Sequence, residues 1–480
     1  MNERPELFVG GRWVSSKGTE RAAVRNPATG AYVGSAALAS PADVDDAVAA
    51  ARDSFDSGVW ADAAPERRAE VLHKAADLLE KRAPELARSI TGELGCPIWF
   101  SEAAHVPNPI RHLRYYADMA RDFPYDERRT DGANTSVVTQ EPVGVVAAVT
   151  PWNGPLSTPT LKTAPALAAG CSVVLKPPPE TPLTVYALAD ALAEAGLPEG
   201  VLSIVPGGRE ASAHLVAHPE VDKIAFTGSS AAGKKIMAVA ADRIARVTLE
   251  LGGKSAAIIC DDADLDAVIP KLLPMALMVN GQACIAQTRV LVPRHREAEI
   301  VDALADALRG QKVGDPADRE TRIGPMVSER QRDRVAGYVT TGRSEGARVV
   351  TGGERLDLPP ELAGGWFVPP TLLAGVDNAM RVAQEEIFGP VLAVIAYEGD
   401  EEAVRIANDS RYGLSGSVWS AAEDRALAIA RRIRTGMVSL NGRPQAFGTP
   451  FGGYKESGVG REMGPEGFRA YLETKSIATG

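Results

Sequence analysis

The chain has 480 residues, with 52 Lys and Arg against 62 Asp and Glu, which gives a net charge of −10. At roughly 100–200 residues per domain, this length predicts two or three domains with a substantial core. No basic block suits a nucleic-acid backbone, no apolar stretch is long enough to span a bilayer, and no export signal is visible, so we expect a cytoplasmic protein with no nucleic-acid or membrane partner.

The predicted elements begin with short strands up to about Asn26. From Pro41 to Glu93, apolar residues recur at helical spacing on a charged background, which predicts helices. From Pro142 onward, short apolar strands alternate with helices, as in a buried parallel sheet, where ligands bind beyond the carboxyl ends of the strands. The expected strands are 143–149, 172–175, 202–205, 224–227 and 248–251, and the first two helices between them are 163–170 and 181–195.

The rest of the chain divides into a second unit and two outlying segments. Residues from about 254 to 441 alternate again and predict another α/β unit. Residues 123–141 and 468–480 fit neither unit, but they contain the β-like runs "TSVVT" and "KSIAT". We expect these two runs to pair as a small outlying sheet.

Two polar residues follow predicted strands of the first unit. Asn153, in "PWN", could donate its amide to a developing oxyanion, although an asparagine is also an ordinary turn residue. Glu250, in "TLELGGKS", could act as a general base beside a cavity, or could simply end a strand before two glycines. Taken one residue at a time, both interpretations stay open.

A phosphate-like loop occurs in "DKIAFTGSSAAGKK", residues 222–235. A strand leads into Gly228, and Gly233 is expected to open a helix whose backbone N–H groups face a ligand. Gly228 to Lys234 also matches GxxxxGK, but Lys235 stands where a P-loop needs a Ser or Thr hydroxyl. A P-loop-like, nucleotide-dependent phosphotransferase is therefore the alternative function, and a purely steric turn is the simplest explanation.

The four cysteines are scattered without a CxxC pair, so we expect reduced thiols. Cys171 and Cys260 fall inside strand-like apolar runs and are predicted core residues, while Cys96 carries no chemical hint. Cys284, in "NGQACIAQTR", lies in a loop between a helical run and a strand. It is the candidate nucleophile, provided that a base or a positive setting activates it.

Other chemistries have little support in the sequence. His214 and His218 form the one i,i+4 histidine pair, but no Glu follows the first in the metalloprotease manner, so we expect no metal site. No GxSxG elbow is present, which argues against an α/β-hydrolase.

In combination, these segments resemble the NAD(P)-dependent aldehyde dehydrogenase superfamily over nearly the whole chain. The matching motifs, in order, are "TPWN", "LKPPPETPL", "FTGSSAAG", "LELGGKS", "NGQACIA", "EEIFGPV", "YGLSGSVW" and "PFGGYKESGVGREMG". The resemblance implies an α/β fold with a Rossmann-like cofactor domain, an α/β catalytic domain and a small β oligomerisation region. The implied boundaries are 1–122 with 142–252 for the cofactor domain, 253–456 for the catalytic domain, and 123–141 with 457–480 for the oligomerisation region.

The resemblance also implies a mechanism for oxidising an aldehyde to the carboxylic acid. Cys284 would attack the aldehyde to form a thiohemiacetal, whose oxyanion is held by Asn153 and the Cys284 backbone N–H. Hydride transfer to NAD(P)+ would leave a thioester, which water activated by Glu250 would hydrolyse. Lys162 and Glu462 are implied to help move protons.

The implied cofactor is NAD, with NADP as the alternative. Lys176 is assigned to the adenosine ribose, Gly228 and Ser229 to the pyrophosphate, and Glu386 and Phe388 to the nicotinamide ribose. The further implied cofactor-binding residues are Thr150, Pro151, Trp152, Gly207, Gly208, Phe226, Thr227, Gly233 and Leu251. One departure concerns the ribose: Pro179, followed by Glu180, stands where many NAD-preferring members carry a glutamate.

Substrate and assembly follow from the same resemblance. The implied substrate tunnel is lined by Gly154, Leu161, Met278 and Phe451, where many members carry more aromatic residues. This lining favours a bulky apolar aldehyde as the small-molecule partner. The outlying segments imply a homodimer or homotetramer.

Overall fold

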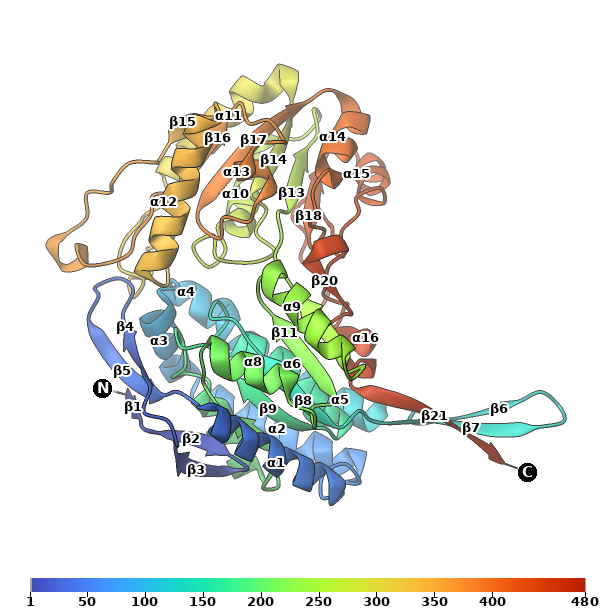
Figure 1. Cartoon of the computed structure of the whole chain (residues 1–480). Helices are drawn as coiled ribbons and strands as arrows, with labels where there is room; N and C mark the ends of the chain where they lie inside the picture. The colour runs from blue at the N-terminus through green and yellow to red at the C-terminus, as the bar shows by residue number, and fades with distance from the viewer. Residues whose placement is uncertain (1, 480) are drawn as a thin grey trace.

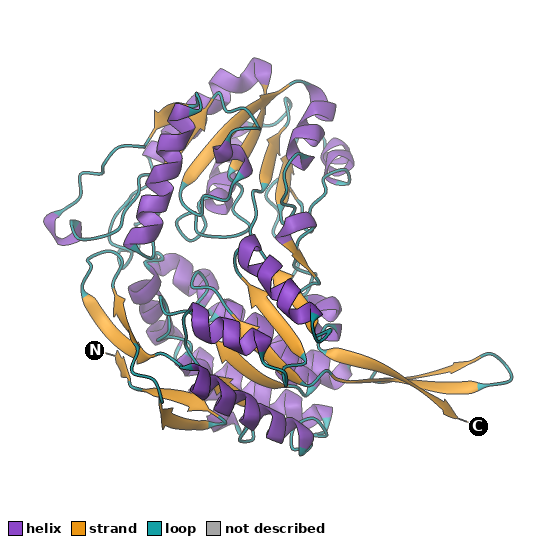
Figure 2. Cartoon of the chain, viewed as in Figure 1, coloured by secondary structure: helices purple, strands orange, loops and turns teal. Residues whose placement is uncertain are grey.

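Two lobes, each built on an open sheet, and a third, projecting sheet make up the chain (Figure 1, Figure 2). The structure, a computed structural model, describes residues 2–479. The first lobe holds an eight-stranded sheet in the order β20-β12-β11-β8-β9-β10-β2-β3, and its five central strands are parallel. Its strands are β2 (Glu6–Val9), β3 (Arg12–Ser15), β8 (Val145–Val149), β9 (Ser172–Lys176), β10 (Leu202–Ile204), β11 (Lys223–Thr227), β12 (Arg246–Glu250) and β20 (Gly458–Val459).

Helices cover both faces of this sheet, which explains the continuous apolar runs of its strands. Val146 and Ala148 of β8 pack with α2, α5, α6 and α7, whereas Val145 and Ala147 pack with α1, α8 and α9. These helices are α1 (Pro41–Asp56), α2 (Pro65–Lys81), α5 (Pro107–Asp122), α6 (Ser157–Ala169), α7 (Tyr186–Ala195), α8 (Arg209–Ala217) and α9 (Ser230–Ala241). The lobe also contains β1 (Asn2–Arg4), β4 (Arg21–Arg25), β5 (Tyr32–Ala37), α3 (Ala83–Leu94), α4 (Ile98–Phe100) and the π-helix η1 (Ser101–His105).

The second lobe repeats this plan with a seven-stranded sheet in the order β15-β16-β17-β14-β13-β18-β19, parallel except at β15. Its strands are β13 (Ala256–Ile259), β14 (Arg289–Pro293), β15 (Arg348–Thr351), β16 (Thr371–Ala374), β17 (Val391–Tyr397), β18 (Gly416–Trp419) and β19 (Ser439–Leu440). One face packs with α10 (Leu265–Ala276) and α11 (Glu297–Arg309). The other face packs with α12 (Glu329–Ser344), α13 (Arg381–Gln384), α14 (Gly399–Asn408) and α15 (Glu423–Ala430).

The two outlying segments pair as predicted. β21 (Leu472–Thr479) pairs with β7 (Thr135–Pro142), and β6 (Asp126–Thr130) completes a three-stranded antiparallel sheet that projects from the body (Figure 1). The register joins Lys475 to Thr139 and Thr479 to Thr135, so "KSIAT" lies against "TSVVT". A short helix, α16 (Gly464–Arg469), precedes β21.

Several predicted boundaries are wrong. The helix expected at 163–170 begins earlier, at Ser157, and the one expected at 181–195 begins later, at Tyr186. Gly233 does not open a helix, because α9 starts at Ser230, where the Ser229 side chain accepts a hydrogen bond from the Ala232 N–H. A serine oxygen at the N-cap satisfies a free helix N–H, which a glycine cannot do.

The cysteine predictions hold for burial but not for placement. Cys171 lies one residue before β9 and Cys260 one residue after β13, so neither is inside a strand, although both are fully buried. Cys96 is also fully buried, and its pKa lies well above the usual value because of that burial.

Candidate active site

The candidate site begins at the carboxyl edge of the first sheet. Lys176, Thr227 and Glu250 are the last residues of β9, β11 and β12, and Thr150 directly follows β8. Since these strands are parallel neighbours, their ends lie at one edge. Four predicted residues from distant parts of the chain are therefore brought together.

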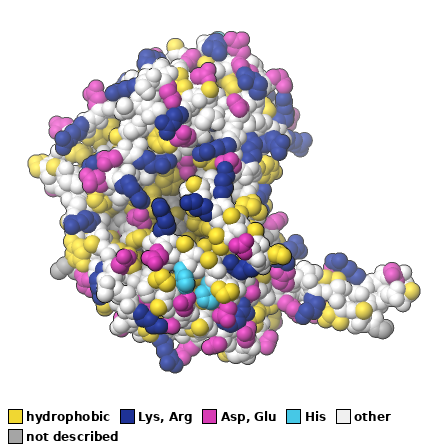
Figure 3. All heavy atoms as spheres, in the orientation of Figure 1, with side chains coloured by type: hydrophobic (Ala, Val, Ile, Leu, Met, Phe, Trp, Pro, Cys, Tyr) yellow, Lys and Arg dark blue, Asp and Glu magenta, His cyan; other side chains and the backbone are white. Residues whose placement is uncertain are grey.

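The amino edge of the second sheet faces this one. Cys284 precedes β14, and Phe388 precedes β17. The Phe388 ring meets the Trp152 ring edge-on with centroids 5.2 Å apart, and the Asn153 Nδ2 donates to the Gln282 carbonyl at 2.9 Å. The space-filling view shows a hollow between the two lobes, with Lys and Arg side chains gathered around it (Figure 3).

The loop that joins β11 to α9 has the form of an anion cradle. Gly228 and Ser229 lie between the strand end and the first turn of α9, where backbone N–H groups and the helix dipole favour a negative group. A Cβ at Gly228 would come within 2.5 Å of the Phe226 ring, so no larger residue fits beside it.

Gly233 and Leu251 contact each other. A Cβ on Gly233 would lie 2.7 Å from the Leu251 side chain, which shows that the glycine lets α9 approach the end of β12 closely. This packing explains the glycine without a ligand.

Lys176 is buried, and its Nζ donates to the Gly207 carbonyl at 3.1 Å, while Gly208 follows as the N-cap of α8. Burial lowers the pKa of Lys176 to about 8. The Thr150 hydroxyl is buried and has no hydrogen-bond partner among the described residues, so it remains free for a bound group. Pro151 and Trp152 follow it, half-buried, at the opening.

Glu386 lies against the two glycines that follow β12 and Leu251. Its Oε1 accepts a hydrogen bond from the Gly253 N–H at 3.0 Å, and a Cβ on Gly252 would meet its carboxylate at 2.6 Å. Burial raises the pKa of Glu386 to about 7. The unpartnered Thr150 hydroxyl, the glycine cradle, the buried Lys176 and the half-buried Glu386 together fit an elongated cofactor with an anionic centre.

Cys284 is half-buried in the loop between α10 and β14. Burial, together with the nearby carboxylates of Glu386 and Glu250, raises its pKa to about 12. The thiol is therefore protonated at neutral pH and depends on a base for its activation.

Glu250 is the predicted candidate for that base. Its side chain is buried, and neither carboxyl oxygen has a hydrogen-bond partner among the described residues. Burial raises its pKa well above the usual value, and the Glu462 charge adds to this, whereas Lys162 and Arg461 act in the opposite direction.

Lys162 and Glu462 form a buried ion pair. The Lys162 Nζ donates to the Glu462 Oε1 at 2.5 Å, and their side chains are 0% and 3% exposed. Lys162 comes from α6, while Glu462 is held by two backbone hydrogen bonds with Phe451, of 2.7 and 2.8 Å. The structure thus brings both predicted proton-handling residues next to Glu250.

The predicted substrate residues separate into two groups. Gly154, Leu161 and Phe451 lie on or beside the segments that carry Asn153, Lys162 and Glu462. A Cβ at Gly154 would collide with the Ser157 hydroxyl at 2.6 Å, so the backbone there admits no side chain. Met278 instead lines an apolar pocket beside α4.

Two positioning contacts escaped the sequence reasoning. Gln282 is fully buried, its carbonyl receives the Asn153 amide, and its own Oε1 accepts from the Val327 N–H at 3.0 Å. Its position in the motif "NGQACIA", two residues before Cys284, could have identified it from the sequence. Arg334 of α12 donates to the Glu386 carbonyl at 2.6 Å, and nothing in its charged helical surroundings distinguishes it.

Comparison with known proteins decides the family. A family model described as "Aldehyde dehydrogenase family" matches residues 13–477. The chain belongs to the aldehyde dehydrogenase family. It is 48% identical over 476 residues to geranial dehydrogenase of Castellaniella defragrans, which covers 99% of this chain and 98% of that protein. It is 42% identical over 479 residues to 3-succinoylsemialdehyde-pyridine dehydrogenase of a Pseudomonas species, with 99% of both covered.

Solved structures agree with the aldehyde dehydrogenase fold. A Mycobacterium tuberculosis aldehyde dehydrogenase complexed with NAD+ has a TM-score of 0.97 and 47% identity, covering 100% of this chain and 99% of that one. A variant of aldehyde dehydrogenase C from Pseudomonas syringae, complexed with NAD+ and octanal, has a TM-score of 0.94 and 42% identity, covering 98% and 96%. The predicted family, fold class and enzyme class are confirmed.

The alternative phosphotransferase finds no support in this aldehyde dehydrogenase. Lys234 is exposed, and its Nζ pairs with Glu456 at 2.8 Å. His214 and His218 both lie near Asp45, and no group of metal-ligating side chains was found among residues 2–479. Within that range, too, no helix has the length and apolarity required to cross a bilayer.

Proposed function

We propose that this aldehyde dehydrogenase oxidises a bulky apolar aldehyde to the carboxylic acid, with Cys284 as nucleophile and Glu250 as general base. The observation that carries the proposal is the buried Glu250 carboxyl, free of hydrogen-bond partners and close enough for its charge to raise the pKa of Cys284. A buried carboxyl group with a raised pKa and no partner is suited to take and release a proton.

NAD+ is the proposed cofactor, with NADP+ as the alternative. Support comes from the NAD+ complexes of two similar structures and from the fit of Thr150, Lys176, Gly228 and Glu386 to an elongated anionic molecule. When bound, it supplies a two-electron acceptor. Glu180, paired with Arg330 at 3.5 Å, follows Pro179 and is the acid nearest in sequence to Lys176 for a ribose hydroxyl.

The chain's own residues then divide the proton work. Glu250, once deprotonated, accepts a proton either from the Cys284 thiol or from the water that hydrolyses the Cys284 thioester. Asn153 donates one amide hydrogen to the Gln282 carbonyl. Its second amide hydrogen is available to the oxyanion, which is the aldehyde oxygen after Cys284 has attacked the carbon. The Lys162–Glu462 ion pair lies beside Glu250, and its two charges shift the pKa of Glu250 in opposite directions.

The proposed substrate class rests on the residues that are predicted to line the substrate tunnel. Gly154, Leu161 and Phe451 present no charge, so an apolar aldehyde loses little solvation there. The names of similar proteins point the same way, since one is a geranial dehydrogenase and another structure contains octanal.

Domains, assembly and location complete the proposal. The first sheet marks a cofactor domain, the second a catalytic domain, and the β6-β7-β21 sheet an oligomerisation region. Support for a homodimer or homotetramer comes from the exposed strands of the projecting sheet, where every residue of β6 is exposed and Ile477 is 46% exposed. A cytoplasmic location suits a reactive thiol that must stay reduced.

A panel of aldehydes assayed with NAD+ and NADP+ in parallel tests the proposal. We expect the highest kcat/KM for bulky apolar aldehydes, and no NADH formation in Cys284→Ala, because removal of a nucleophile costs about 10,000-fold or more. Cys171→Ala, which removes a different buried thiol, is the matched control and should still form NADH. A highest kcat/KM for acetaldehyde or a charged semialdehyde would contradict the substrate class.

A further inference from the structure

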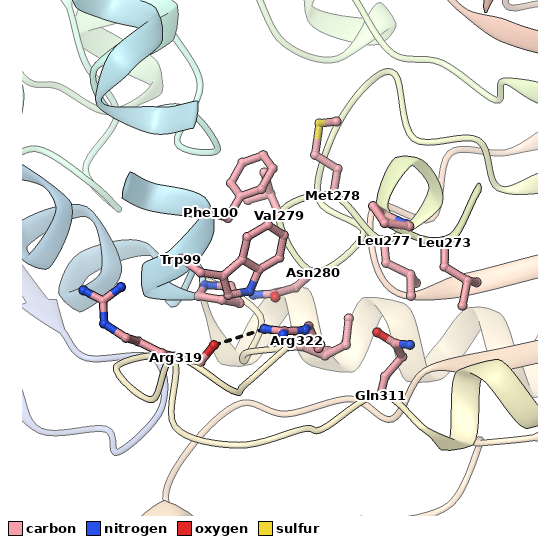
Figure 4. Close-up of a pocket in the computed structure, with 13 residues that line it drawn as sticks. Trp99, Phe100, Leu273, Leu277, Met278, Val279, Asn280, Gln311, Arg319 and Arg322 are labelled. Atoms are coloured by element: carbon pink, nitrogen blue, oxygen red, sulfur yellow. Dashed lines mark hydrogen bonds between the residues drawn. The ribbon is translucent and has the colours of Figure 1, made fainter. Parts of the chain in front are cut away.

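A second pocket lies outside the candidate active site, between α4 and α10 (Figure 4). Its cavity volume is about 490 Å³, within the range of small-molecule sites. None of Cys284, Glu250, Asn153 or Lys162 lines it. The lining residues are Pro97, Trp99, Phe100, Leu273, Pro274, Leu277, Met278, Val279, Asn280, Gln311, Arg319, Arg322 and Ile323.

The pocket has an apolar side and a polar side. Phe100, Leu277 and Met278 form part of the apolar wall, whereas Gln311 and Arg322 lie at the other side (Figure 4). An apolar body and one polar end therefore describe the shape of ligand that the walls can satisfy together.

The charge on the polar side belongs to Arg322, whose side chain is exposed to solvent. The Arg322 guanidinium lies 5.6 Å from the Trp99 ring centroid and donates through Nη1 to the Arg319 carbonyl at 3.0 Å. It forms no ion pair with any carboxylate of the described residues. The neighbouring Arg319, by contrast, is bound through both Nη atoms to Glu102, each at 2.7 Å.

The walls are held in place by contacts of their own. The Trp99 indole N–H donates to the Thr321 carbonyl at 2.9 Å, which fixes the ring beside the loop that carries Arg322. On the opposite wall, Val279 and Asn280 adopt left-handed backbone conformations with φ of 52° and 59°. The Asn280 amide holds them there by donating to the Gly95 and Pro325 carbonyls at 3.0 and 2.9 Å. The pocket is thus formed before any ligand arrives, which lowers the entropic cost of binding.

We propose that this pocket is a second binding site, which takes an apolar monocarboxylate with its carboxylate on Arg322. A guanidinium that lacks an acidic partner binds a carboxylate through charge-assisted hydrogen bonds, and the apolar wall covers the hydrocarbon part. An acid of this class is the product of the reaction proposed above, so the identity of the natural occupant rests on that proposed function, whereas the site itself does not.

Calorimetric titration of octanoate into the full-length Cys284→Ala protein tests the site without turnover. We expect saturable binding whose Kd rises at least about tenfold in Arg322→Gln, because a charge-assisted hydrogen bond is lost. Arg322→Lys should recover part of the affinity. In the matched control Arg319→Gln, which changes an arginine of the same loop already paired with Glu102, the Kd should stay within about twofold.

Octan-1-ol separates the charge contact from a general change in the pocket. Its weaker binding should be the same in all these proteins, since it offers no carboxylate to Arg322. Gln311→Glu should weaken octanoate binding by charge repulsion and leave octan-1-ol unaffected. Absence of saturable octanoate binding, an unchanged Kd in Arg322→Gln, or an equal loss for octan-1-ol would overturn the second site. NADH formation by the wild-type enzyme is measured separately, so a failure of the second site can be told apart from a failure of the proposed function.

Discussion

Glu250 and Glu462 are two glutamates of similar burial whose surroundings differ. Glu250 ends β12, is 2% exposed and has no hydrogen-bond partner on either oxygen within residues 2–479. Glu462 lies after β20, is 3% exposed and is bound to Lys162 at 2.5 Å. Burial alone therefore does not decide the state of a carboxyl group in this site.

The difference lies in how each charge is neutralised. A buried carboxylate without a partner is so costly that it takes up a proton instead, and the pKa of Glu250 is raised accordingly. Lys162 compensates the charge of Glu462. The Lys162 charge also lowers the pKa of Glu250. The paired glutamate can stay charged and support the structure, while the unpaired one can exchange protons and do chemistry.

Lys162→Met breaks the paired side and should have the largest effect. It leaves Glu462 buried without a counter-charge, so we expect the free energy of unfolding to fall by about 3–5 kcal/mol. The shift of the urea midpoint of purified protein measures this loss. In Lys162→Met/Glu462→Gln much of the stability should return, since no buried charge is left; equal instability of the two variants would contradict the account.

Glu250→Gln alters the unpaired side and should separate activity from stability. The amide has the same shape but cannot accept a proton, so we expect kcat to fall about 100- to 10,000-fold. Because the amide keeps the shape of the side chain and no hydrogen bond between described residues is lost, the urea midpoint should move little. A large loss of stability in this variant would show that Glu250 has a charged partner in solution.

The pH dependence of kcat/KM gives the third and smallest effect. The base form of Glu250 is the deprotonated one, and its pKa is raised, so the rate should increase about tenfold per pH unit below that pKa and then level off. In Arg461→Gln the rise should move to higher pH by a fraction of a unit, because the Arg461 charge lowers the pKa of Glu250. A shift to lower pH would contradict the assignment of the rise to Glu250.

Stability should depend on pH in the opposite sense. The folded-state pKa of Glu250 lies above its unfolded value near 4.5, so its contribution to stability is complete below that value. It is lost as the pH rises from about 4.5 through the folded-state pKa. Glu250→Gln should therefore flatten the decline of the urea midpoint in this window, measured against wild-type protein.

Elements with a strong local pattern were predictable. The apolar runs of β8, β9 and β11 stand out because both faces of a parallel sheet are buried, and "TSVVT" and "KSIAT" contain β-branched residues, which favour strands. Helix starts were less predictable, since α6 begins at Ser157 rather than 163 and α7 at Tyr186 rather than 181, and neither has a side-chain N-cap hydrogen bond to mark its start.

By itself, the sequence determined the family, the order of strands and helices, and the chemical types of the candidate residues, because local spacing and motif order carry that information. Only the tertiary structure decided which glutamate is paired and which is free. Lys162 and Glu462 are 300 positions apart, and no local pattern reports such a contact. The same holds for Arg322, whose unpaired charge becomes evident only once every nearby carboxylate has its place.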